Sequence, residues 1–178
     1  MPKTLMCDPR LLQKELSGYV YIVTGANSGS GLATAEQLAR QGAHVVAACR
    51  RPDAGEKAFA GLGDIAGSVE VMQLDLASLA SVRGFAEAFS AKFERLDGLA
   101  NNAGIADFAP VHEETLAGWE RQMAVNVTGT FLASRAVLPG MLERGSGSIV
   151  NFGSVAGMCG IPTMAAYCAA KGAVVNLT

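Results

Sequence analysis

The sequence predicts an α/β protein in which a doubly wound parallel sheet lies between two layers of helices. Short apolar runs alternate with longer helical patterns from Gly18 onward. Several of these runs are almost unbroken, as in strands covered on both faces. Half of the 178 residues are hydrophobic and only 17% are charged, which is enough apolar material for one core. Strands and helices that alternate with right-handed crossovers give this three-layer α/β/α class.

Five strands are expected, at residues 19–24, 44–49, 69–74, 96–100 and 148–152. The helix after the first strand should turn its apolar residues inward and end at Gly42; those residues are Leu32, Ala35, Leu38 and Ala39. Between the third and fourth strands, residues 78–93 predict an amphipathic helix. Its apolar residues recur every three or four positions, and they are Leu79, Val82, Phe85, Phe89 and Phe93.

Composition excludes several classes of partner. A net charge of -2 gives no broad basic field, so we expect no nucleic acid and no anionic membrane as the main partner. The first 17 residues, expected to be an N-terminal extension, lack a secretory signal, and no stretch reaches the ~18 apolar residues of a membrane span. The cysteines are scattered, which predicts free thiols in a cytoplasmic protein and no metal site; they are Cys7, Cys49, Cys159 and Cys168.

A glycine-rich turn follows the first strand directly. Residues 24–31 read TGANSGSG and open the first helix. Glycines allow a tight turn and close approach of the backbone to a phosphate, and the start of a helix presents free N–H groups to an anion. The alternative is a turn rich in Gly, Asn and Ser that binds nothing.

Tyr167 and Lys171 are four residues apart, a spacing that places both side chains on one face of a helix. A phenol has a reference pKa of ~10, and a fixed positive charge beside it favours the anion that acid–base chemistry near neutral pH requires. The pair is therefore a possible chemical unit. The alternative for Tyr167 is an aromatic residue on a helix surface.

Further motifs follow in order: LDL at 74–76, NNAG at 101–104, Asn126 in a long helical stretch, and Ser154 thirteen positions before Tyr167. In this order, with the glycine turn, residues 18–178 resemble the short-chain dehydrogenase/reductase family. The resemblance implies a Rossmann-type fold and an oxidoreductase that moves hydride between a nicotinamide cofactor and a carbonyl or alcohol substrate. Ser30 stands where this family usually has an apolar residue, which could loosen the packing beneath the cofactor.

The resemblance also implies residue roles. Tyr167 would be the acid or base, and Ser154 would bond the same substrate oxygen. Lys171 would bond the nicotinamide ribose, and Asn126 would hold a water that links Lys171 to solvent. The implied catalytic set is Asn126, Ser154, Tyr167 and Lys171. The implied cofactor set is Gly25, Asn27, Ser28, Gly29, Ser30, Gly31, Arg50, Arg51, Asp75, Leu76, Asn102, Ala103, Gly104, Tyr167 and Lys171.

The end of the second strand bears on cofactor choice. An acidic residue there would bond the ribose 2′-OH of NAD, whereas an arginine would receive the 2′-phosphate of NADP. The acid would fall at Cys49, and Arg50 and Arg51 follow it, so NADP is favoured over NAD. The alternatives make Asp53 the acid, or the arginines a solvated turn.

The chain ends seven residues after Lys171, whereas members of this family continue into further strands and helices. We therefore expect a domain that lacks the family's last elements, with the fifth strand at the edge of its sheet. The full-length form is expected to be a homo-oligomer. Two functions remain open: an NADP-dependent oxidoreductase, or a non-catalytic nucleotide-binding portion of one.

Overall fold

A computed structural model describes residues 8–178, so the first part of the expected extension, including Cys7, lies outside the described residues. Five parallel strands form one sheet in the order β3-β2-β1-β4-β5, which confirms the predicted fold class. The strands are β1 (Val20–Thr24), β2 (His44–Cys49), β3 (Ser68–Gln73), β4 (Gly98–Asn101) and β5 (Ser148–Asn151). Each lies within two residues of its expected position.

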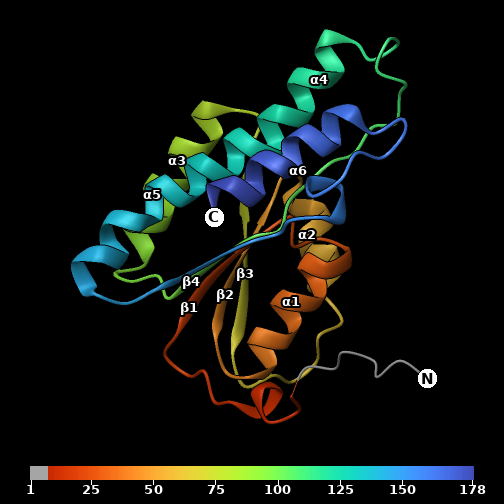
Figure 1. Cartoon of the computed structure of the whole chain (residues 1–178). Helices are drawn as coiled ribbons and strands as arrows, with labels where there is room; N and C mark the ends of the chain where they lie inside the picture. The colour runs from red at the N-terminus through yellow and green to blue at the C-terminus, as the bar shows by residue number, and fades with distance from the viewer. Residues whose placement is uncertain (1–7) are drawn as a thin grey trace.

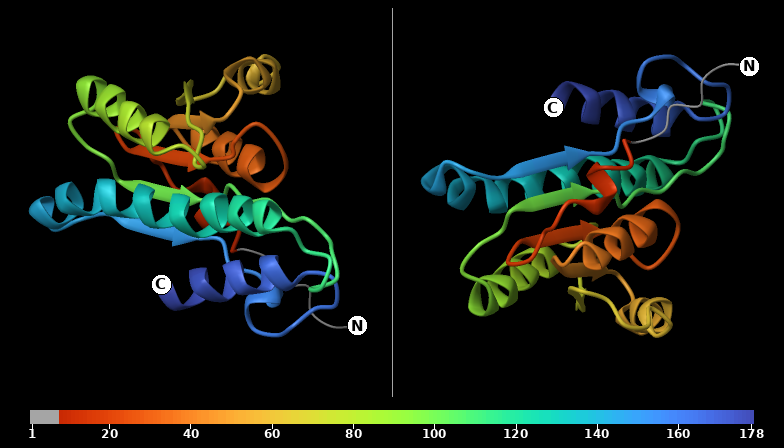
Figure 2. Two further views of the ribbon diagram at one scale, coloured as in Figure 1. Left: turned by 90° about the horizontal axis from the view of Figure 1, so that it is seen from above. Right: turned by 90° about the horizontal axis from the view of Figure 1, so that it is seen from below.

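Helices cover both faces of the sheet (Figures 1 and 2). On one side lie α1 (Gly29–Arg40) and α2 (Pro52–Phe59), and on the other α3 (Leu79–Lys92), α4 (Leu116–Met123) and α5 (Gly129–Arg144). A π-helical segment, η2 (Ala124–Thr128), joins α4 to α5 into one continuous rod. The last helix, α6 (Ala165–Leu177), packs against α4, η2 and a short 3₁₀ turn, η3 (Val155–Gly157).

Alternate residues of the strands contribute to two hydrophobic cores, one on each face of the sheet. On the α1 and α2 side, Val23, Val45 and Ala47 are fully buried with Ala35 and Ala39 of α1. On the other side, Ile22, Val46 and Leu99 pack with Val82 and Phe89 of α3 and Met141 of α5. Such burial of strands on both faces is the reason for their unbroken apolar sequences.

Two expectations about helices have different outcomes. Gly42 ends the first helix as predicted, with a φ of +98° that favours glycine. The apolar stripe of α3 is formed by Val82, Phe85, Phe89 and Phe93, but Leu79 was wrongly included and is 57% exposed. Leu79 is the first residue of α3, one turn before the part of the helix that packs on the sheet.

Residues before β1 lie against the end of α1. Leu16 is buried and its N–H donates to the carbonyl of Gln41 over 2.7 Å. The Gln41 side-chain amide donates to the carbonyls of Leu11 and Lys14 at 2.8 and 2.9 Å, which ties in a 3₁₀ turn, η1 (Leu11–Gln13). At least the second half of the expected extension is therefore packed on the domain.

The fifth strand lies at the edge of the sheet, as expected. Among residues 8–178, β5 pairs only with β4, and Val150 on it is 52% exposed. No helix in this range is long and apolar enough to cross a membrane. The three cysteines described, Cys49, Cys159 and Cys168, are free thiols.

Candidate functional site

A cleft opens at the carboxyl ends of β1 and β4, which are neighbours at the point where the strand order reverses. Open parallel sheets bind ligands at this point. The cleft has a volume of ≈ 350 Å³. Its lining brings together most of the predicted cofactor residues: Gly25, Asn27, Ser28, Gly29, Ser30, Arg50, Asp75, Leu76, Asn102, Ala103 and Gly104.

The glycine turn forms one wall of the cleft, and two of its glycines are required by close approach. A Cβ on Gly25 would lie 2.9 Å from the Cα of Ala103, and a Cβ on Gly31 would lie 2.4 Å from the Nδ2 of Asn102. Ser28 is the N-cap of α1, and its side chain makes no capping hydrogen bond. The first N–H groups of α1 are thus left without that acceptor, which suits an anionic ligand.

Thr24 and Asn102 join the glycine turn to the NNAG stretch. The Thr24 hydroxyl accepts from the N–H groups of Asn102 and Ala103 at 3.1 and 3.0 Å. The Asn102 amide donates back to the Thr24 carbonyl over 2.9 Å. Ser30, which could have loosened this packing, instead donates its hydroxyl proton to Asn102 Oδ1 over 2.8 Å. The polar side chain of Ser30 therefore has a hydrogen-bond partner in the NNAG stretch.

The residues at the end of β2 lie in different environments. Cys49 is completely buried in the core against α2, and burial raises the pKa of its thiol. Arg50 is exposed and lines the cleft, whereas Arg51 is the N-cap residue of α2 and is absent from the lining. Asp53 lies in the first turn of α2, also away from the lining.

Asp75 lines the cleft beyond β3 and also has a local role. Its Oδ1 accepts from the N–H of Ala77 over 3.0 Å, and its own N–H donates to Ser81 Oγ over 2.9 Å. The carboxylate therefore both closes the turn that leads into α3 and faces the cleft.

Asn126 lies in the π-helical segment and is buried. Its side-chain amide accepts from the Ile105 N–H over 2.9 Å and donates to the Ile105 carbonyl over 2.8 Å. A Cβ on Gly104 would lie 3.0 Å from Asn126 Oδ1 and 3.6 Å from Lys171 Nζ, so the three residues meet at one point. π-helical turns inside α-helices occur frequently at functional sites.

Lys171 is only 5% exposed, and its Nζ donates to the Phe152 carbonyl over 2.6 Å. Desolvation lowers the pKa of this buried ammonium below its usual value. Its Nζ lies 5.8 Å from the ring centroid of Tyr167, one turn earlier on α6, so the expected shared helix face is observed. Neither residue is part of the cleft lining.

Ser154 follows β5 and is the N-cap of η3, where its Oγ accepts from the Ala156 N–H over 3.2 Å. η3 packs directly on α6. The contact depends on Gly157, because a Cβ there would lie 2.6 Å from the Lys171 carbonyl oxygen. Ser154 is thereby held next to the helix that carries Tyr167.

Several residues that shape the site were missed from the sequence. Gln122, one turn before Asn126, is fully buried, and its Oε1 accepts from the Asp107 N–H over 3.2 Å. The loop after β4 also bonds to the loop before α6, where the Ala109 N–H donates to the Thr163 carbonyl over 2.9 Å. The cleft lining gains further members: Thr24, Ala48, Leu74, Ile105 and Val125. Two of them begin motifs of the sequence, Thr24 in TGANSGSG and Leu74 in LDL, but neither was assigned to the cofactor set.

Among residues 8–178, no three or more His, Cys, Asp or Glu side chains lie close enough together to hold a metal ion.

Comparisons with known proteins point to one family. The sequence model of the short chain dehydrogenase family matches residues 19–178. A 2-(S)-hydroxypropyl-CoM dehydrogenase 3 from Xanthobacter autotrophicus is 48% identical over 94% of this chain and 66% of its own length. An inactive 2-(S)-hydroxypropyl-CoM dehydrogenase 2 from the same organism is 54% identical over 81% of this chain and 61% of its own length. The chain thus spans less than two thirds of these relatives.

Among solved structures, a metagenomic short-chain oxidoreductase in complex with NADP superposes with a TM-score of 0.87 at 35% identity. The match covers 91% of this chain and 74% of that protein.

Proposed function

This chain belongs to the short-chain dehydrogenase family, and from that premise we propose that it forms the cofactor-binding and proton-transferring part of an NADP-dependent oxidoreductase. The substrate would be a small carbonyl compound or alcohol. The observation that carries the proposal is the meeting of Asn126, Gly104 and Lys171 beside the cleft, with Tyr167 on the same helix face as Lys171. The proposal includes a cytoplasmic location, in keeping with free thiols.

NADP fits the residues of the cleft. The glycine turn and the uncapped start of α1 would hold its pyrophosphate, and Arg50 would bond its 2′-phosphate. When bound, the nicotinamide supplies or accepts the hydride. The related metagenomic oxidoreductase is in complex with NADP, which supports this choice.

The side chains around Lys171 would carry out the proton transfer. In the reductive direction the Tyr167 hydroxyl would give its proton to the substrate oxygen, and Ser154 would donate a hydrogen bond to the same oxygen. The phenolate left on Tyr167 would be stabilised by the Lys171 ammonium. Lys171 uses one N–H on the Phe152 carbonyl, which fixes its direction and leaves two for other partners.

Paired arginine variants test the cofactor assignment. Arg50→Ala removes a charge-assisted phosphate contact of ~1.5 to 3 kcal/mol, so NADPH affinity should fall about tenfold or more while NADH affinity hardly changes. Arg51→Ala is the matched control and should change NADPH affinity by less than about threefold, because Arg51 does not line the cleft. Titration by fluorescence measures both. A chain that binds NADH as tightly as NADPH would contradict the assignment.

Turnover tests the reaction. Tyr167→Phe keeps the ring and removes the transferable proton, so it should suppress carbonyl reduction by at least about 100-fold with little change in NADPH affinity. Near-normal turnover of this variant would refute the role of Tyr167.

A second candidate function is nucleotide binding without turnover. The 54% identical relative whose name marks it as inactive favours it. Tight NADPH binding by a wild-type chain that reduces no carbonyl compound in a broad panel would select this alternative.

A further inference from the structure

A second cavity lies on the face of the sheet covered by α3 and α5, between these two helices, with a volume of ≈ 260 Å³. Ile22 and Leu99 of the sheet line it from below. Val82, Phe85 and Phe89 of α3 line one side, and Val137 of α5 lines the other. Exposed residues also line it, among them Ser90 and Ala136, so the cavity opens to solvent along the groove between the two helices.

The side chains on α3 explain why the space remains. Phe85, Phe89 and Phe93 stack along the helix, with ring centroids 6.5 Å and then 4.8 Å apart. The rings therefore contact one another along α3, and they face Ala133 and Ala136 on α5, which are too short to fill the gap. The cavity presents aromatic faces and aliphatic carbon to whatever enters it.

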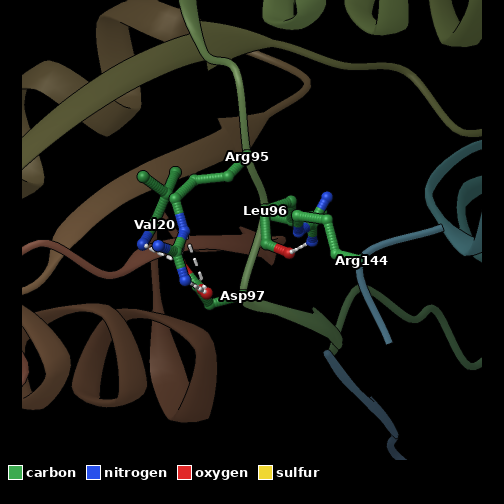
Figure 3. A network of polar contacts seen from close by, with 5 residues as sticks. All are labelled: Val20, Arg95, Leu96, Asp97 and Arg144. Carbon is green, nitrogen blue, oxygen red and sulfur yellow. Dashed lines mark hydrogen bonds and ion pairs between the residues drawn. The ribbon is translucent and has the colours of Figure 1, made fainter. Parts of the chain in front are cut away.

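The two arginines at the outer end of the cavity have protein partners (Figure 3). Arg144 donates to the Leu96 carbonyl, and Arg95 is paired with Asp97. Asp97 in turn accepts from the Val20 N–H over 2.8 Å, which anchors the start of β1. Glu94, which also lines the cavity, adds a negative charge at this end. Two arginines and two carboxylates balance in formal charge, so this end of the cavity has no net charge to attract an ion.

The inner end of the cavity reaches the functional site. Thr24 and Leu74 line both this cavity and the cofactor cleft, so a single layer of side chains separates the two spaces. Thr24 also holds the N–H groups of Asn102 and Ala103. The cavity therefore shares Thr24 and Leu74 with the cofactor cleft, although most of its other lining residues are apolar.

We propose that the α3–α5 cavity binds a neutral apolar molecule about the size of a single aromatic ring or a short alkyl chain. An apolar cavity of about 150 Å³ in another protein binds benzene, and the present cavity is larger, with aliphatic and aromatic side chains over most of its lining. The site is separate from the one that binds NADP, and the inference does not depend on the proposed reaction.

Toluene is the probe for this proposal, and thermal unfolding is the readout. At ten times its Kd, toluene should raise the Tm of the wild-type chain by about 3 to 6 °C, because it binds only the folded state. Ala136→Phe places a ring in the cavity mouth and should reduce the rise to under about 1 °C. Ala91→Phe, at an exposed position of α3 outside the lining, is the matched control and should keep the full rise.

Two outcomes would overturn the proposal: no rise with the wild-type chain, or the same rise with all three proteins. If Ala136→Phe fails to fold, methyl NMR of the wild-type chain decides instead. Toluene should then shift the methyl signals of Val82 and Val137, which line the cavity, and leave those of Val45 unchanged on the opposite face of the sheet. Equal shifts at all three valines, or none, would refute the site.

Discussion

The contact between η3 and α6 allows a sharp prediction about Gly157. A Cβ added at this position would lie 2.6 Å from the carbonyl oxygen and 2.7 Å from the carbonyl carbon of Lys171. These are backbone atoms of a helix, so no side-chain rotation relieves the clash. To reach an ordinary contact of 3.4 Å, η3 has to move about 0.8 Å away from α6.

That displacement has a calculable cost. Overpacking of this kind destabilises a protein by about 1 to 3 kcal/mol, which lowers the Tm of a domain of this size by about 2 to 12 °C. Ser154 is the N-cap of η3 and moves with it, away from α6, the helix that carries Tyr167. A misplacement of about 1 Å can lower a rate by about 100-fold, so we expect Gly157→Ala to lose about 10- to 100-fold in turnover.

Thermal melting and a carbonyl reduction assay measure both effects. Gly160→Ala is the matched control, because it lies in the same loop and a Cβ there would meet nothing within 4 Å. NADPH affinity should change little in either variant, since neither glycine lines the cleft. If Gly157→Ala melts and turns over like Gly160→Ala, the close packing of η3 on α6 is not what holds Ser154 in place.

Three further predictions concern stability and association. Desolvation lowers the pKa of Lys171 in the folded state below its ordinary value of 10.5, so the unfolded chain binds the proton more tightly. The free energy of unfolding of the wild type should therefore increase, relative to that of Lys171→Met, as the pH rises toward 10.5. Urea unfolding of both proteins over this pH range measures the difference. Gln122→Met removes the acceptor of the Asp107 N–H, so hydrogen exchange at that amide should accelerate about tenfold while overall stability changes by less than about 1 kcal/mol. Val150→Lys on the open edge of β5 should reduce concentration-dependent self-association in size-exclusion chromatography, whereas Leu142→Lys, exposed on α5, should not.

The strands were predictable from sequence because a strand buried on both faces consists almost entirely of apolar residues. β2 is expected and found at the same six residues, His44–Cys49, five of them buried. The end of α1 was equally clear, since Gly42 adopts a conformation that few other residues tolerate. The error at Leu79 shows the limit of periodicity, which continues through the first turn of α3 although that turn does not cover the core.

For the functional motifs, the sequence predicted which residues belong to them but not which of those residues line the cleft or what local geometry they adopt. Arg50 and Arg51 are adjacent and chemically identical, yet of the two only Arg50 lines the cleft, and Arg51 is the N-cap of α2. Likewise Asn126 was expected within a long helix, and the local change to π-helical geometry is not visible in the apolar pattern of the sequence. Both distinctions depend on where the backbone goes after a strand or within a helix.

Gln122 and Thr24 were missed for one physical reason. The Gln122 side chain accepts from the backbone N–H of Asp107 in the loop after β4, just as the predicted Asn126, one turn later, bonds to the backbone of Ile105. Thr24 does the same for the NNAG stretch. In each case the partner is a backbone group: every residue provides a carbonyl and every residue other than proline an N–H, so no complementary residue type appears in the sequence. Side chains that bind backbone in this way fix the shape of the site, and only the folded chain reveals them.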